Sequence, residues 1–219
     1  MLKIIEKLKT DAWRTAGARY NAARRLKRRD LFSTISLSLF SAAGVGLAVI
    51  QKIYNPQSGS PLDNYLTGLS VCLSVFLLVL SLIEWGAGNS VKADRLHQNA
   101  EELSAFWRRL DLEIINLQSQ LPTQANAFSA AEYLKEYDEI KAKCGFNHDP
   151  LDDHLFVASQ RHAGEFKRNG KEPYCWLEQR WLVFRSHFSS VWYFVSLWII
   201  IAVLIYVTPW TQTVKVVTQ

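Results

Sequence analysis

The side chains that most often act as catalysts or metal ligands gather in one part of the sequence, residues 144–175. They are Cys144, His148, Asp149, Asp152, Asp153, His154 and Cys175. Their spacing matches no short-range zinc pattern and no nucleophile–base arrangement, and aspartate beside a helix start is ordinarily a helix cap or a solvated acid. The sequence also holds no phosphate-binding loop. We therefore predict no catalytic site, no metal site and no cofactor.

Polar side chains of another kind lie within apolar sequence, where hydroxyl residues recur at intervals that place them on one face of a helix. The first stripe is Thr34, Ser38 and Ser41, and the second is Thr67, Ser70, Ser74, Ser81 and Glu84. Small and hydroxyl residues let membrane helices approach each other closely. In an oligomer the same faces can line a water-filled path. Both interpretations stay open, and the second makes these residues candidates for lining a pore.

Glu84 ends the second stripe. An ionisable group inside or at the edge of a membrane span suggests a function, here at the cytoplasmic mouth of a path. Glu84 also lies close enough to the expected interface for simple solvation to account for it.

Three apolar segments are long enough to cross a bilayer, since about 20 helical residues span its hydrocarbon core. They predict an all-α integral membrane protein: a two-span helical hairpin with long cytosolic helical extensions and a third, C-terminal transmembrane helix. We expect residues 1–30 to form a basic amphipathic cytoplasmic helix and residues 31–88 to form the hairpin, with spans at 31–50 and 66–88. Residues 89–188 should form a cytoplasmic helical region that contains a heptad rod at 96–121. The third span is expected at 189–208 and an outer tail at 209–219.

The basic residues are distributed unevenly between these segments. Residues 1–30 and 89–188 hold 23 of the 25 lysines and arginines, and three spans place both segments on one side. The positive-inside rule makes that side cytoplasmic. We expect the cluster before the first span to contact anionic lipid headgroups, which leaves no need for a nucleic-acid partner. The cluster is Arg24, Arg25, Lys27, Arg28 and Arg29.

Beyond the second span, apolar residues alternate at spacings of four and three over four heptads, which is the seam of a coiled coil. The seam is Leu96, Ala100, Leu103, Trp107, Leu110, Ile114, Leu117 and Leu121. Because no proline interrupts the run before Pro122, we expect one unbroken helix over residues 66–121. Its seam can assemble a homo-oligomer, pack on the chain's own helices, or do both. The N-terminal helix presents alanines at helical spacing, which favours packing on this rod over lying among headgroups.

Residues 173–188 combine five aromatic side chains with Arg180, Arg185 and His187. This composition is typical of a helix that enters the membrane through the headgroup layer. The third span that follows is bulky and apolar all round apart from Ser189, Ser190 and Ser196, so we expect it to face lipid and not a pore.

Three segments resemble the SLATT domain family, in particular its fifth subfamily: residues 12–40 (AWRTAGARYNAARRLKRRDLFSTISLSLF), residues 71–111 and residues 137–153 (YDEIKAKCGFNHDPLDD). The resemblance extends over residues 5–185. It implies a two-span effector of bacterial conflict systems in the inner (plasma) membrane, associated with nucleotide-making or nucleotide-sensing partner proteins. The third span departs from the two-span pattern.

The leading hypothesis joins the resemblance to the stripes. On a signal such as a nucleotide second messenger, an antiphage (abortive infection) effector would assemble as a homo-oligomer and form or open a pore in the bilayer. The alternative is a non-conducting membrane anchor that recruits a cytosolic partner enzyme.

Overall fold

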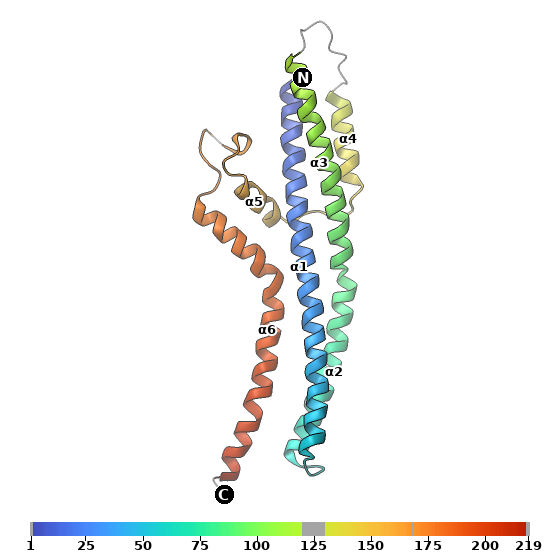
Figure 1. Cartoon of the computed structure of the whole chain (residues 1–219), viewed down its shortest axis with the longest axis vertical. Coiled ribbons are helices and arrows are strands. Elements are labelled where there is room, and N and C mark those ends of the chain that lie inside the picture. The colour runs from blue at the N-terminus through green and yellow to red at the C-terminus, as the bar shows by residue number, and fades with distance from the viewer. Residues whose placement is uncertain (1, 120–129, 168, 218–219) are drawn as a thin grey trace. The chain divides into compact units, whose positions relative to one another are not determined.

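The computed structural model describes residues 2–119, 130–167 and 169–217, with side chains described up to residue 203. The elements are helices: α1 (Leu2–Tyr54), α2 (Pro61–Ala87), α3 (Asn89–Ser119), α4 (Ala130–Ala142), α5 (Pro150–Ser159), the short 3-10 helix η1 (Gly164–Phe166) and α6 (Trp176–Val217) (Figure 1). The all-α prediction is confirmed. Three of the helical stretches are long and apolar enough to cross a membrane.

The chain divides into two compact units. The rod unit contains residues 1–27 and 90–188, and the span unit contains residues 28–89 and 189–219. The first half of α1 and the first turns of α6 therefore belong to the rod unit, whereas the remainder of each helix belongs to the span unit.

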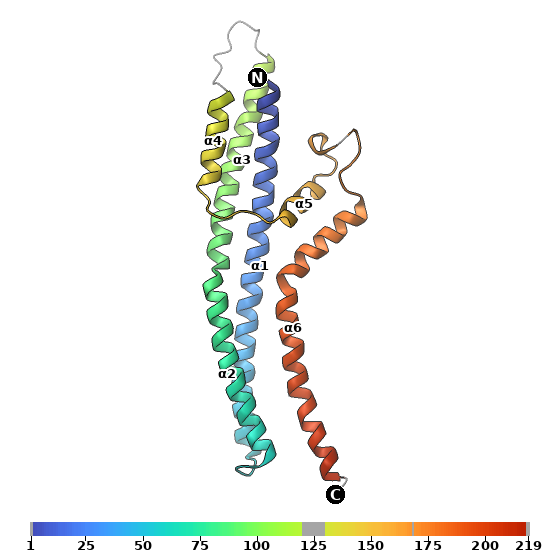
Figure 2. The ribbon, with the colours of Figure 1, turned by 180° about the vertical axis from the view of Figure 1, so that it is seen from behind.

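The core of the rod unit is formed by α1, α3 and α4, which lie side by side in both views (Figures 1 and 2). Small side chains of α1, Ala12 and Ala16, face larger ones of α3, including Leu103 and Phe106, and α4 adds Tyr137. Small residues on one helix let the second helix approach closely, and the larger side chains then fill the space between them. The predicted packing of the N-terminal helix on the rod is confirmed.

Helix α5 lies against α1 at Gly17. A Cβ atom built on this residue would come within 2.1 Å of the Phe156 ring, so only glycine fits there. The Trp13 ring meets Phe156 edge-on, with centroids 5.5 Å apart, and stacks on Phe166 of η1 at 5.1 Å. The ring contacts of Trp13 and the close approach of Phe156 to Gly17, one turn further along, thus fix α5 and η1 to α1.

The span unit packs three helical segments together. Leu47 of α1 and Leu66 and Leu73 of α2 form the hairpin contact. The part of α6 that begins at residue 189 joins them through Trp198, whose indole lies 4.6 Å from the Phe40 ring and donates a hydrogen bond to Ser36 Oγ at 3.1 Å. One side of the third span therefore packs on α1, where an aromatic ring with a polar N–H gains from a protein partner, and the expectation that this span faces lipid and not a pore stays a prediction.

The helix predicted to run unbroken over residues 66–121 is interrupted. Gly88 takes a left-handed conformation with φ 58° and caps α2 through a hydrogen bond from its N–H to the Trp85 carbonyl. This is the usual way for glycine to end a helix, and α3 starts at the next residue. The described part of α3 ends at Ser119, so Leu121 of the predicted seam lies outside the described residues.

Candidate functional site

The hydroxyl stripe on α1 is exposed along its whole length. Thr34, Ser38 and Ser41 all lie on the surface of the chain. Thr34 Oγ1 donates to the Asp30 carbonyl at 3.0 Å, and Ser38 Oγ donates to the Thr34 carbonyl at 2.9 Å. A hydroxyl bonded to its own helix leaves no unmet donor in hydrocarbon and keeps its oxygen lone pairs for water or a neighbouring helix.

The stripe on α2 is divided between two environments. Ser74 is exposed and Ser81 is half-buried, and each donates to a carbonyl of its own helix at 2.8 Å. Thr67 instead accepts a hydrogen bond from Gln51 Nε2 of α1 at 2.9 Å, so it helps to close the hairpin. Ser70 Oγ is buried without a hydrogen-bond partner. Ser74, in the middle of this stripe, is thus open to a second molecule or a water path.

Glu84 lies apart from the exposed portion of its stripe. Its side chain is 6% exposed, with Arg29 Nη2 at 3.4 Å from one carboxylate oxygen and Asn89 Nδ2 at 3.4 Å from the other. Glu84 is therefore neither solvated nor turned toward an open face in the single chain. It forms a loose ion pair inside the span unit, and its place in a pore stays a prediction.

The residues of the heptad seam pack against other helices of the same chain. Among its residues, Leu96, Ala100, Leu103, Leu110 and Ile114 are buried. Trp107 and Leu117 pack against the core shared with α1 and α4, and the Trp107 ring centroid lies 6.3 Å from that of Trp13. In this conformation the described seam residues are buried or partly buried against other helices of the chain, so assembly through most of the seam would require α3 to leave α1.

The basic cluster before the first span already has several partners inside the protein. Arg25 binds Asp152 through two hydrogen bonds, Lys27 lies 3.2 Å from Asp94, and Arg29 lies near Glu84. The cluster is therefore less free for lipid than the sequence suggests. Arg24 is exposed. Headgroup contact by the cluster stays a prediction, and Arg25, whose guanidinium is taken up by Asp152, is its weakest member.

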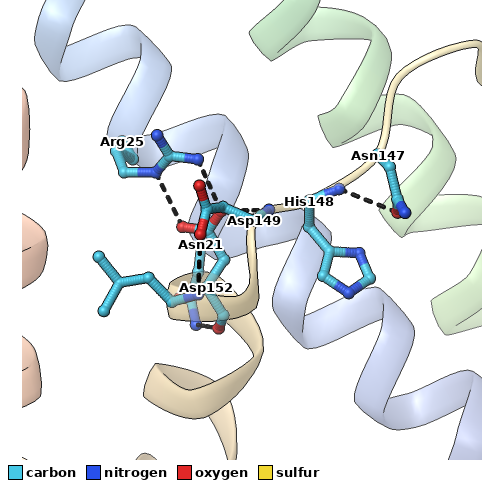
Figure 3. A network of polar contacts seen from close by, with 7 residues as sticks. Asn21, Arg25, Asn147, His148, Asp149 and Asp152 are labelled. Carbon is cyan, nitrogen blue, oxygen red and sulfur yellow. Dashed lines mark hydrogen bonds and ion pairs between the residues drawn. The ribbon is translucent and has the colours of Figure 1, made fainter.

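The acid cluster of residues 149–153 holds α5 on α1 (Figure 3). Asp152 is fully buried and accepts from Arg25 Nε at 3.0 Å and from Arg25 Nη2 at 2.8 Å. Its other contacts are the Asp149 N–H, in a capping box, and Asn21 Nδ2, which donates to its backbone carbonyl. We call Asn21, Arg25 and Asp152 the α5 clamp. Hydrogen bonding to Asp152 raises the pKa of Arg25.

A second ion pair reinforces this contact. Arg14 donates from Nε and Nη2 to the two carboxylate oxygens of Asp153 at 2.6 and 2.5 Å, and this bonding raises its pKa. The sequence interpretation identified the cap, which Asp149 provides, but missed the clamp. The missed signal is on α1, where Arg14, Asn21 and Arg25 are seven and four residues apart and so share one helix face.

A buried arginine of α1 lies where this helix packs on α3. Arg19 is 4% exposed and donates from Nη1 to Asn99 Oδ1, while Asn99 Nδ2 donates to the Ile140 carbonyl at 2.6 Å. Burial lowers the pKa of Arg19 and also that of His148. Arg19 thereby links α1, α3 and α4 by one polar chain. Among the described residues, no group of histidine, cysteine and acidic side chains could hold a metal ion.

Comparison with known proteins identifies one match. The family model described as SMODS and SLOG-associating 2TM effector domain family 5 (SLATT_5) matches residues 1–208. No curated protein and no solved structure matches the chain. The match covers both units and includes the third candidate span.

Proposed function

The chain belongs to family 5 of the SMODS and SLOG-associating 2TM effector domains, and is thus a membrane effector of conflict systems. From this premise we propose that it acts by forming or opening a pore as a homo-oligomer in the bacterial inner membrane. In an infected cell such a pore would discharge the membrane and stop growth, as in abortive infection.

The observation that carries the proposal is the exposure of hydroxyl side chains on both helices of the hairpin. Ser38 and Ser41 on α1 and Ser74 on α2 lie on the surface of the span unit, where a single chain in lipid would gain more from apolar residues. One hairpin cannot enclose a water path, but several copies arranged around an axis can. These faces would then turn toward the axis and the bulky apolar ones toward lipid.

The rod unit is the proposed receiver of the signal. The family's description associates it with SMODS and SLOG proteins, so we expect the partner to be a protein that makes or senses a nucleotide. The rod unit holds nearly all contacts between α1, α3, α4 and α5, and α1 continues from it into the span unit as one helix. A movement of α1 together with the helices packed on it in the rod unit would therefore be transmitted to the first span.

The proposal is tested by replacing hydroxyls in the middle of the α2 stripe with leucine. The double variant Ser74→Leu, Ser81→Leu should insert normally but lose leakage of a dye from liposomes, because a path lined by leucine dewets. The matched control is Ser196→Leu on α6, whose hydroxyl likewise donates to its own helix, to the Trp192 carbonyl at 2.9 Å.

Leakage by the double variant equal to that of the unchanged protein would remove α2 from the pore. A protein that never leaks but binds a partner enzyme at the membrane would instead act as a non-conducting anchor.

A further inference from the structure

The first turns of α6 carry a narrow stripe of large apolar side chains on the surface of the rod unit. Leu177, Trp181, Phe184 and Phe188 are 68%, 62%, 56% and 56% exposed. At 3.6 residues per turn, their spacing of four, three and four places them within about 60° of one another around the helix. We call these four residues the α6 stripe.

The rings of the α6 stripe already contact one another. Trp181 stacks on Phe184 and Phe184 stacks on Phe188, with centroids 5.7 Å apart in each pair. The same helix turns its opposite side, which includes Leu182 and Ser186, toward the protein. The stripe is thus an ordered apolar ridge that the rod unit leaves in the open.

Two arginines border the ridge. Arg180 lies on one side, with its guanidinium 5.5 Å from the centre of the Trp176 ring, and Arg185 lies on the other. Both are exposed. An apolar strip flanked by long cationic side chains, which can reach headgroup phosphates while their stems stay in apolar surroundings, is the pattern of a helix that lies in a membrane interface.

We propose that the α6 stripe is a membrane-binding surface that lies in the headgroup layer of an anionic leaflet. Chain continuity argues for lipid as the occupant: the stripe ends at Phe188, α6 continues without a break, and the third candidate span follows at once. Residues that directly precede a membrane span lie at its interface with water, which is why we assign the stripe to lipid. A heptad-like spacing also suits a second helix, but arginine on both borders would place like charges opposite each other across a symmetric helix pair.

The proposal assigns the stripe a role distinct from a pore. It binds the rod unit to the leaflet from which the third span enters, whether or not the spans conduct. Its test therefore does not depend on leakage.

The test uses the full chain with Cys72, Cys144 and Cys175 replaced by serine and one new cysteine carrying an environment-sensitive fluorophore. Labels at Trp181→Cys and Phe184→Cys are compared with a label at Leu112→Cys on α3, a residue of the rod unit that is 64% exposed. The protein is placed in liposomes of phosphatidylcholine and phosphatidylglycerol, with a quencher attached to the lipid headgroup.

Both α6 labels should show blue-shifted emission and at least threefold stronger quenching than the α3 label. Equal quenching of all three labels would overturn the proposal. It would also be overturned by quenching at position 184 alone, which would mean that the first turns of α6 stand upright and that only the part nearest the third span meets the headgroups. Energy transfer between two copies labelled at position 181, without quenching by lipid, would assign the stripe to a second copy and likewise reject it.

Discussion

Asp152 is the residue on which the docking of α5 most depends. Its carboxylate is fully buried and bonded to Arg25, and its backbone carbonyl accepts from Asn21. A buried ion pair stabilises the fold little more than apolar residues of the same shape would. Removing one partner is nevertheless costly, because the other charge is then left without a counter-charge.

We therefore expect Asp152→Ala to lower the free energy of unfolding of the rod unit by about 3–5 kcal/mol. Thermal unfolding in detergent would measure the loss. The control is Asp138→Ala on α4, whose side chain is 73% exposed and only 3.7 Å from Lys141 in an i,i+3 pair. A loss no larger than that of the control would show that the α5 clamp does not hold this contact.

His148 should make stability depend on pH. Burial lowers its pKa below the ordinary 6.5, so the unfolded chain binds a proton more readily than the folded chain. Stability should therefore fall as pH decreases through about 6.5 and below. His148→Gln should make stability depend less steeply on pH, as measured by thermal unfolding between pH 7.5 and 5. The control is His154→Gln, at an exposed position, which should leave the pH dependence of stability unchanged. An unchanged slope in His148→Gln would contradict the half-buried environment of the ring.

The residue scale is where the sequence was least informative. The sequence shows that Asp149, Asp152 and Asp153 stand beside a proline at a helix start, which predicts caps and solvated acids. It does not show that Asp152 and Asp153 meet Arg25 and Arg14, because those partners are 127 and 139 residues away along the chain. Only the packing of α5 on α1 brings the charges together.

At the scale of the helices, the packing of α1 on α3 decides how the protein can assemble. The heptad residues of α3 are buried against α1, and Lys9 joins Asp111 across the same contact at 2.9 Å. For α3 to pack on a second copy instead, α1 and α3 would first have to separate and expose the apolar side chains between them.

We expect leakage to survive when α1 and α3 are tied together. Lys9→Cys and Asp111→Cys, in a chain with serine in place of its three native cysteines, can be joined by a short bis-maleimide. Liposomes carrying the bridged and unbridged proteins would be compared for dye release. Because the proposed path is lined by the spans, the two should release dye equally. Loss of leakage only in the bridged protein would mean that α1 and α3 must separate, either to pass the signal to the first span or to free the seam for a second copy.

The helices could be predicted because apolar residues recur at helical spacing, or run on for the length of a membrane span. The partner of the seam was not, since an apolar stripe has the same spacing whichever helix covers it. The break at Gly88 was also missed: one glycine beside a long apolar run does not reveal whether its φ is positive, as it is here at 58°. The stripe of hydroxyls was predicted as a helix face, but Thr67 proved to bond with Gln51 across the hairpin.

At the scale of the molecule, the family match over residues 1–208 and the three candidate spans describe one membrane effector. The sequence predicted the spans from the length of its apolar segments, and it predicted the family from the resemblance carried by residues 12–40, 71–111 and 137–153. It also placed a polar face on each helix of the hairpin, and pore formation by those faces is the central claim.

Dye and ion leakage from liposomes, measured together with the mass of the purified protein in detergent, tests that claim most directly. The protein is assayed alone, with a panel of cyclic oligonucleotides, and with its nucleotide-making or nucleotide-sensing partner. We predict leakage from an oligomer of defined mass under at least one of these conditions. Liposomes that stay tight under every condition, although the protein is correctly inserted, would contradict the pore and leave a membrane anchor.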